Sequence, residues 1–241
     1  MTSPFRTSET QPLGGISLGL EVSEAKTAPL DGPNADNPMP EIQISKPIKI
    51  AAGVSSNAKQ HVLLVRDHSS SMSGTKIDEL NAASQSLVQE LANPQNKDGF
   101  RVSFVDFSSK AQLAVFAQPA EGLTIAKLNA SGGTDFEQAL VETISAAQAF
   151  QAQPNPQGWQ YLRPQVLFLS DGQSQASDKI MRELQDLADV TSIAYGSDAD
   201  VSMLSRISSD GQVHIIGTNG GELRKFLAEV GQTLSQALAT R

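Results

Sequence analysis

Short apolar runs alternate with amphipathic segments along most of this chain, and this alternation restricts the possible folds more than any other feature. Continuous apolar runs occur at Val62–Val65 and Val166–Leu169, and further strand-like segments cover 190–196 and 213–217. Apolar runs of this length are typical of strands that are covered on both faces of a parallel sheet. We therefore predict an α/β domain with a Rossmann-like, doubly wound, mostly parallel sheet and helices on both faces.

Apolar residues recur every three or four positions between these strands, as in amphipathic helices. The helices predicted from this spacing run from Ile77 to Leu91, Phe136 to Phe150, Ile180 to Ala188, Val201 to Ile207 and Gly221 to Leu238. Thr134 or Gly133 is the predicted cap of the second helix, with Asp135 as an acid in its first turn. Two strands, Phe100–Phe107 and Ala111–Phe116, are separated by only three residues, which suits a hairpin and predicts one antiparallel edge strand.

Residues 1–50 differ in composition from the rest of the chain. The first 40 residues hold six prolines among many small polar residues, a composition that buries too little apolar surface to offset chain entropy. Two stretches, 16–22 and 41–50, alternate between apolar and other residues as a strand does, although Pro47 restricts the second to a sheet edge. We predict an irregular N-terminal extension, partly an extended strand, over 1–50 and one domain over 51–241.

Composition excludes several classes of function. The net charge of −8 and the lack of a Lys/Arg cluster argue against nucleic acid and anionic lipid as partners. There is no cysteine, so disulfide scaffolds, thiolate metal sites and cysteine nucleophiles are excluded. No segment reaches the roughly 18 uncharged apolar residues of a membrane span. The N-terminus has no apolar run typical of a signal peptide, and a cytoplasmic location is the expectation.

Oxygen-bearing side chains gather in three loops that follow or connect the predicted strands. The loop after the first strand holds Asp67, Ser69 and Ser71, the loop before the second helix holds Thr134, and the strand 166–169 leads into Asp171. Ligands of an open parallel sheet bind beyond the carboxyl ends of its strands, so these five residues are predicted to converge. Carboxylates and hydroxyls suit Mg²⁺, with Mn²⁺ or Ca²⁺ as alternatives, rather than zinc or copper. Hydroxyls neutralise little of the ion's charge, so the ion would attract an acidic side chain of a protein partner.

At these residues the chain resembles the von Willebrand factor A (VWA) domain and its metal-ion-dependent adhesion site (MIDAS). The family pattern is D-x-S-x-S, then Thr, then Asp, and it matches Asp67-x-Ser69-x-Ser71, Thr134 in GGTD and Asp171 in LSDG. The resemblance covers roughly residues 58 to 240. It implies that the three hydroxyls bind the metal directly, that the two aspartates bind it directly or through water, and that a partner's Asp or Glu, or water, completes the shell.

A narrower resemblance, to bacterial cytoplasmic members of tellurite-resistance-type stress clusters, comes from DHSSSMSG and the YLRPQVLFLSDG stretch. Two residues depart from the usual pattern. His68 fills a position that commonly holds a small or hydroxyl residue, and Ser170 replaces the commoner Thr. Neither change removes a ligand, and His68 could alter access to the ion.

Three residues are candidates for contact with a partner: His68, Trp159 and Tyr161. Aromatic anchors are enriched at binding hot spots. For Trp159 and Tyr161, packing over the sheet edge is an equally good interpretation.

The predicted function is non-enzymatic: a divalent-metal-dependent module that engages an acidic side chain of a partner. One alternative is a metal-dependent hydrolase or phosphatase that uses Ser69 or Asp67 as nucleophile. The chain has no D-x-D, no G-x-S-x-G elbow and no P-loop, which argues against this alternative. Another alternative is a structural assembly subunit whose N-terminal extension docks on another subunit.

Overall fold

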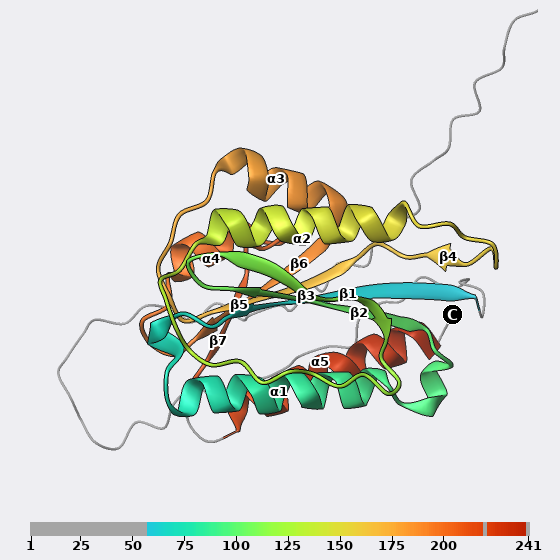
Figure 1. The fold of residues 1–241 in the computed structure, drawn as a ribbon, viewed down its shortest axis with the longest axis horizontal. Coiled ribbons are helices and arrows are strands. Elements are labelled where there is room, and N and C mark those ends of the chain that lie inside the picture. The colour runs from blue at the N-terminus through green and yellow to red at the C-terminus, as the bar shows by residue number, and fades with distance from the viewer. Residues whose placement is uncertain (1–56, 219–220, 240–241) are drawn as a thin grey trace, which may run out of the picture.

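A twisted sheet between two layers of helices forms the body of the protein in a computed structural model (Figure 1). Residues 57–218 and 221–239 are described, so the predicted extension over 1–50 and its two strand-like stretches lie outside the described residues. The strands are β1 Ala58–Asp67, β2 Phe100–Phe107, β3 Ala111–Pro119, β4 Gln160–Tyr161, β5 Gln165–Ser170, β6 Asp189–Tyr195 and β7 Val213–Ile216. The helices are α1 Thr75–Leu91, α2 Phe136–Gln151, α3 Asp178–Leu187, α4 Val201–Ile207 and α5 Glu222–Ala239, with short 3₁₀ turns at Ser70–Met72 and Pro94–Asn96.

The sheet has the order β3-β2-β1-β5-β6-β7, and β4 pairs with the first residues of β1. Every described pairing is parallel except that of β2 with β3, which is antiparallel at the sheet's edge. This arrangement confirms the predicted fold class. The three-residue connection after Phe107 is too short for a parallel crossover, and this length explains the one reversal.

Two hydrophobic cores lie on opposite faces of the sheet. One joins alternate residues of the central strands, including Val62 and Leu64, to α1 and α5. The other joins the intervening residues, including Leu63 and Val65, to α2, α3 and α4. Helices cover both faces of β1, and all ten of its residues are buried. This two-sided burial accounts for the continuous apolar run Val62–Val65.

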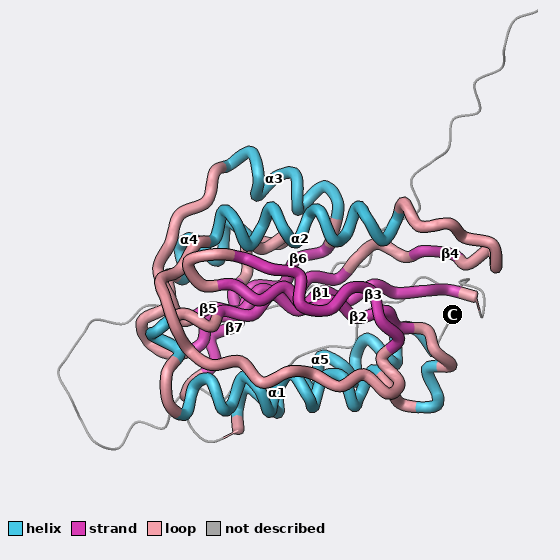
Figure 2. Tube along the Cα trace, viewed as in Figure 1, coloured by secondary structure: helices cyan, strands magenta, loops and turns pink. Residues whose placement is uncertain are grey.

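A long loop, residues 120–135, crosses from β3 to α2 alongside α1, as Figure 2 shows. Asn81 on α1 holds this loop through the backbone of Leu128: its amide nitrogen donates to the Leu128 carbonyl (3.0 Å), and its amide oxygen accepts from Leu128 N (2.8 Å). These two hydrogen bonds fix the path of the loop toward the carboxyl ends of the strands.

Two local features differ from the sequence prediction. The cap of α2 is Asp135, whose carboxylate accepts a hydrogen bond from Gln138 N (3.0 Å), and neither Thr134 nor Gly133 fills this role. Both Thr and Asp are good caps, and here the threonine side chain faces the neighbouring loop instead. The two-residue strand β4 was not predicted, because a pair of residues is too short to show periodicity.

Within the described residues, no helix has the length and apolar character needed to cross a membrane.

His61 is a buried imidazole in the middle of β1. Its Nε2 lies 2.8 Å from Ser103 Oγ, and Ser103 Oγ also accepts a hydrogen bond from Ala117 N (2.9 Å). The Ser103 hydroxyl can thus donate its own proton to Nε2 or accept a second bond from it, according to the tautomer of the ring. Nδ1 is buried without a partner among the described residues. Burial lowers the pKa of His61 to about 3 from its usual 6.5.

We predict that this histidine makes the fold acid-sensitive. As the pH falls from 6.5 toward 3, the unfolded chain binds a proton at His61 that the folded chain does not, so stability is lost at about 1.4 kcal/mol per pH unit. His61→Leu removes this contribution. Urea unfolding of both proteins over this range should show the stability of the wild type, relative to the variant, falling with pH. Parallel curves for the two proteins would contradict the prediction.

Candidate metal centre

The carboxyl ends of β1 and β5 bring Asp67 and Asp171 to the same edge of the sheet. The two strands pair in parallel, so their last residues lie side by side. Asp67 ends β1 and Asp171 directly follows β5. The side chains are almost wholly buried, with 0% and 1% exposed. Two carboxylates so close together and so little solvated favour binding of a positive charge.

The loop before α2 is fastened to the loop after β1. Ser131 N donates to the His68 carbonyl (2.7 Å), and Ser70 N donates to the Gly132 carbonyl (3.0 Å). These bonds join segments about sixty positions apart in the sequence. They hold Thr134 close to the end of β1.

A chain of hydrogen bonds connects four of the predicted ligands. Asp67 Oδ1 accepts from Ser69 N (2.8 Å), the hydroxyls of Ser69 and Ser71 lie 3.0 Å apart, and Ser71 donates to Asp171 Oδ1 (2.7 Å). Ser71 is exposed, whereas Ser69 and the carboxylates are buried. The cluster therefore opens to solvent on the Ser71 side.

Thr134, the fifth predicted ligand, faces the same space. A Cβ atom added to Gly172 would lie 2.9 Å from Thr134 Oγ1 and 3.5 Å from Asp67 Oδ2. Because Gly172 has no side chain, the space beside Thr134 Oγ1 and Asp67 Oδ2 is not filled by a Cβ atom. The structure brings all five predicted residues together at the edge of the sheet.

Ser170 positions the Asp67 carboxylate. Its hydroxyl donates to Asp67 Oδ2 (2.5 Å) and accepts from Gly172 N (2.9 Å). In the sequence Ser170 stood out only as a departure from the usual threonine. A serine hydroxyl supplies both bonds, and no methyl group is needed for them.

Lys76, in the first turn of α1, is a charged neighbour of the site that the sequence analysis missed. Its ammonium lies 2.5 Å from Asp171 Oδ2, the oxygen that Ser71 does not use. One signal was present in the sequence: a lysine in the first turn of a helix opposes the helix dipole, which favours acids there. Its partner, however, lies 95 positions further along the chain.

The electrostatics of the site follow from burial and from its carboxylates. Burial raises the pKa of Asp67, the hydrogen bonds from Ser170 and Ser69 oppose this rise, and the nearby Asp171 charge adds to it. Tyr195, the last residue of β6, also has a raised pKa. Burial, together with the charges of Glu79, Asp171 and Glu222, raises its pKa to about 12.

The donor set fits a hard divalent cation. Two carboxylates and three hydroxyls offer only oxygen, which suits Mg²⁺, Mn²⁺ and Ca²⁺. Among the described residues there is no group of three or more His, Cys, Asp or Glu side chains placed to hold a metal ion. The five-oxygen cluster has only two such side chains, and its other donors are hydroxyls. It therefore remains the candidate metal site.

The three partner-contact candidates occupy different ends of the sheet. His68 is half-buried beside the cluster, with Nδ1 buried and unpartnered among the described residues. Tyr161 pairs with Lys59 at the start of β1, eight residues before Asp67, or about 26 Å along the strand. Trp159 lies at that far end too, with Lys59 Nζ 4.8 Å from its ring centre. The structure does not bring the two aromatic residues to the metal centre.

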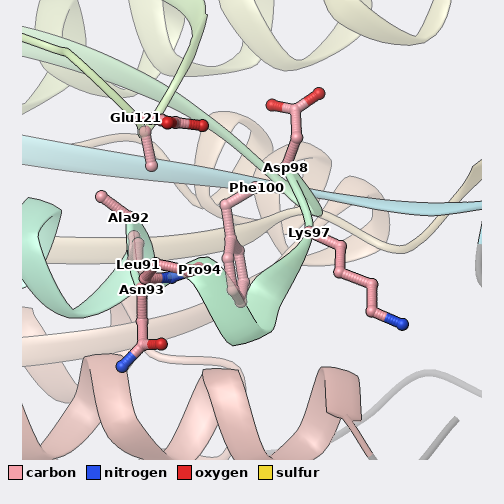
Figure 3. A pocket seen from close by; sticks show the side chains of 9 residues that line it. Leu91, Ala92, Asn93, Pro94, Lys97, Asp98, Phe100 and Glu121 are labelled. Atoms are coloured by element: carbon pink, nitrogen blue, oxygen red, sulfur yellow. The ribbon is translucent and has the colours of Figure 1, made fainter.

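A pocket of about 240 Å³ also lies away from the cluster, where α1 ends and β2 begins (Figure 3). Its walls come from both apolar and charged side chains, among them Leu91, Phe100, Lys97, Asp98 and Glu121. None of the five predicted metal ligands lines it.

Comparisons with known proteins agree on the fold. One similar structure is a von Willebrand factor type A protein from Catenulispora acidiphila, with 15% identity, a TM-score of 0.58 and coverage of 76% of this chain and 43% of that one. Another is the ArnB paralog VWA2 of Sulfolobus acidocaldarius, with 17% identity, a TM-score of 0.55 and coverage of 76% and 47%. A third is mussel byssus proximal thread matrix protein 1 with a zinc-occupied MIDAS motif, with 16% identity, a TM-score of 0.55 and coverage of 77% and 48%.

This chain spans less than half of the length of these three structures. No curated protein matches the sequence. The family model of the von Willebrand factor type A domain matches residues 61–227, which is more than half of the chain and includes all five clustered residues. On this match and on the shared fold, the chain belongs to the von Willebrand factor type A domain family.

Proposed function

We propose that this protein is a binding module that holds a divalent cation at Asp67, Ser69, Ser71, Thr134 and Asp171 and uses it to engage an acidic side chain of a protein partner. The observation that carries the proposal is the meeting of these five oxygen-bearing side chains, from three separate loops, around one glycine-lined space. Protein–protein interaction is a general role of VWA domains.

Each residue has a distinct task in this proposal. The hydroxyls of Ser69, Ser71 and Thr134 would contact the ion without neutralising it, and Asp67 and Asp171 would supply the negative charge. A bound ion would act as a Lewis acid that accepts one more oxygen ligand. Because Ser71 is the exposed member of the cluster, an outside carboxylate would approach from its side.

Mg²⁺ is the proposed ion because every donor is oxygen, with Mn²⁺ or Ca²⁺ as alternatives. Zinc is recorded in the MIDAS motif of the mussel protein. Zinc prefers nitrogen and sulfur donors, and the five residues offer neither. A competition titration of Mg²⁺ against Zn²⁺ would decide which of these two ions the site prefers.

Two further aspects stay predictions from the sequence. A bacterial cytoplasmic setting is what the narrower resemblance implies. A non-enzymatic role follows from the missing catalytic motifs. No observation on the described residues favours the hydrolase or the assembly subunit as a second candidate.

Removal of the Asp67 carboxylate tests the proposal. We expect Asp67→Ala to abolish heat release in a Mg²⁺ titration and to abolish Mg²⁺-dependent capture of protein partners, because the ion loses half of the site's carboxylate charge. Affinity purification with and without EDTA measures the second effect. Asp198→Ala, which removes an exposed carboxylate from the loop after β6, is the matched control. Capture by the Asp67 variant at the wild-type level would refute the proposal.

The glycine that leaves space in the cluster gives a second prediction. Gly172→Ala places a methyl group 2.9 Å from Thr134 Oγ1, so the threonine must rotate its hydroxyl away. Displacement of a ligand should weaken Mg²⁺ binding by roughly 10- to 100-fold in calorimetry.

The control for this change is Gly133→Ala, whose Cβ would meet nothing nearer than Ser109 Oγ at 3.4 Å, an ordinary contact. It should bind Mg²⁺ as the wild type does. Equal affinity for both alanine variants would show that the cation is not held beside Gly172.

A further inference from the structure

The ammonium of Lys76 occupies a place in the metal centre that its helix does not explain. It lies in the first turn of α1, where the helix dipole disfavours a positive charge and where Asp78 is the expected kind of residue. The side chain is only 19% exposed, and its Nζ lies 2.5 Å from Asp171 Oδ2. A lysine gives up hydration and side-chain freedom to take such a position, and an interaction with the buried carboxylate offsets that loss.

The backbone turn at the end of β6 lies against this ammonium. Gly196 has a φ of +90°, and a Cβ atom there would lie 3.4 Å from Lys76 Nζ and 3.5 Å from its Cε. Gly196 N donates to the Ile216 carbonyl (2.9 Å), which holds the turn in place. Lys76 is thus seated between the ends of β5 and β6 rather than pointing into solvent.

Asp171 is shared between two groups. Its Oδ1 accepts from Ser71, a predicted metal ligand, and its Oδ2 accepts from Lys76. The lysine therefore takes part of the negative charge on which a cation at the cluster depends. Like charges a few ångströms apart repel strongly in a partly buried site.

We propose that Lys76 is a built-in counter-cation that keeps the intrinsic affinity of the site for a divalent ion low and makes tight ion binding depend on the partner's carboxylate. This inference rests on the proposed function. A divalent ion held by Asp67 and Asp171 alone is neutralised, whereas with Lys76 beside it the loaded site carries one net positive charge. A single carboxylate from outside neutralises that charge.

The consequence is positive coupling between the ion and the acid. Each ligand binds better when the other is present, and the coupling is the same in both directions. Without the lysine, an incoming carboxylate would meet a neutral site and would gain less from it. Lys76 thus acts as a positioning and charge-setting residue rather than as a metal ligand.

Calorimetric titration with MgCl₂ tests the first half of the proposal. Lys76→Met should bind Mg²⁺ at least about tenfold more tightly than the wild type, since a nearby positive charge has been removed. Lys76→Arg keeps the charge and should stay near the wild-type affinity. Lys110→Met removes the same charge from an exposed position in the turn between β2 and β3, and should change the affinity by less than about twofold because exposed charges are screened.

Acetate is the probe for the second half. When potassium acetate replaces potassium chloride at constant ionic strength, Mg²⁺ binding to the wild type should tighten, and binding to Lys76→Met should tighten less. Thermal unfolding supplies a readout that does not depend on calorimetry. Added Mg²⁺ should raise the melting temperature of Lys76→Met more than that of the wild type, because stabilisation by a ligand grows with its affinity.

The outcomes separate this inference from the proposed function. If the wild type binds Mg²⁺ and Lys76→Met binds it equally or more weakly, Lys76 is only a structural tie and the inference fails while the proposed function stands. If neither protein binds Mg²⁺, both fail. Tight binding by Lys76→Met alone would support the inference in its strongest form.

Discussion

The register of β1 against its neighbours is the constraint on which the metal centre depends. A slip of one residue would turn Asp67 to the other face of the sheet, because side chains alternate along a strand. Arg66 and Asp106 lie opposite each other in β1 and β2 and form a buried two-bonded ion pair (2.7 and 3.0 Å) one residue before Asp67. Removal of either partner would leave an unpaired buried charge, so this pair penalises the wrong register more than it adds net stability.

Much of this arrangement could be predicted from the sequence, because it depends on local patterns. The apolar runs gave the strands, the three- and four-residue spacing gave the helices, and the rule that ligands meet at strand ends gathered the five site residues from three loops. What could not be predicted depends on contacts between distant residues. The choice of Asp135 over Thr134 as the cap of α2 is one case, and the ion pair of Lys76 with Asp171 is another. β4 exists only because β1 extends far enough to pair with it.

The two ends of the sheet have opposite electrostatic characters. At the amino end of β1, Trp159 lies against Lys59 and Arg101, and both cations bond to Asp98, whose pKa is lowered chiefly by the hydrogen bonds from Arg101. There two cations share one carboxylate and the face of one indole ring, which leaves a net positive charge. At the carboxyl end burial, with the nearby carboxylates adding to it, raises the pKa of Tyr195, and Lys76 offsets the charge of these carboxylates only in part. In the proposed function, the external cation is needed at the carboxyl end, where the hydroxyls gather.

In the proposed function, this imbalance explains why a site of hydroxyls suits reversible recognition. A cation surrounded by three or four carboxylates would be neutralised by the protein and would have no reason to attract a partner. Two carboxylates, one of them shared with a lysine, leave the ion short of negative charge while the buried Asp67 and its bonds to Ser69 and Ser170 hold the cluster's shape. The same shortage weakens the hold on the ion when no partner is present. Affinity for the ion and attraction for an acid are thus opposed within one site, and Lys76 sets the balance between them.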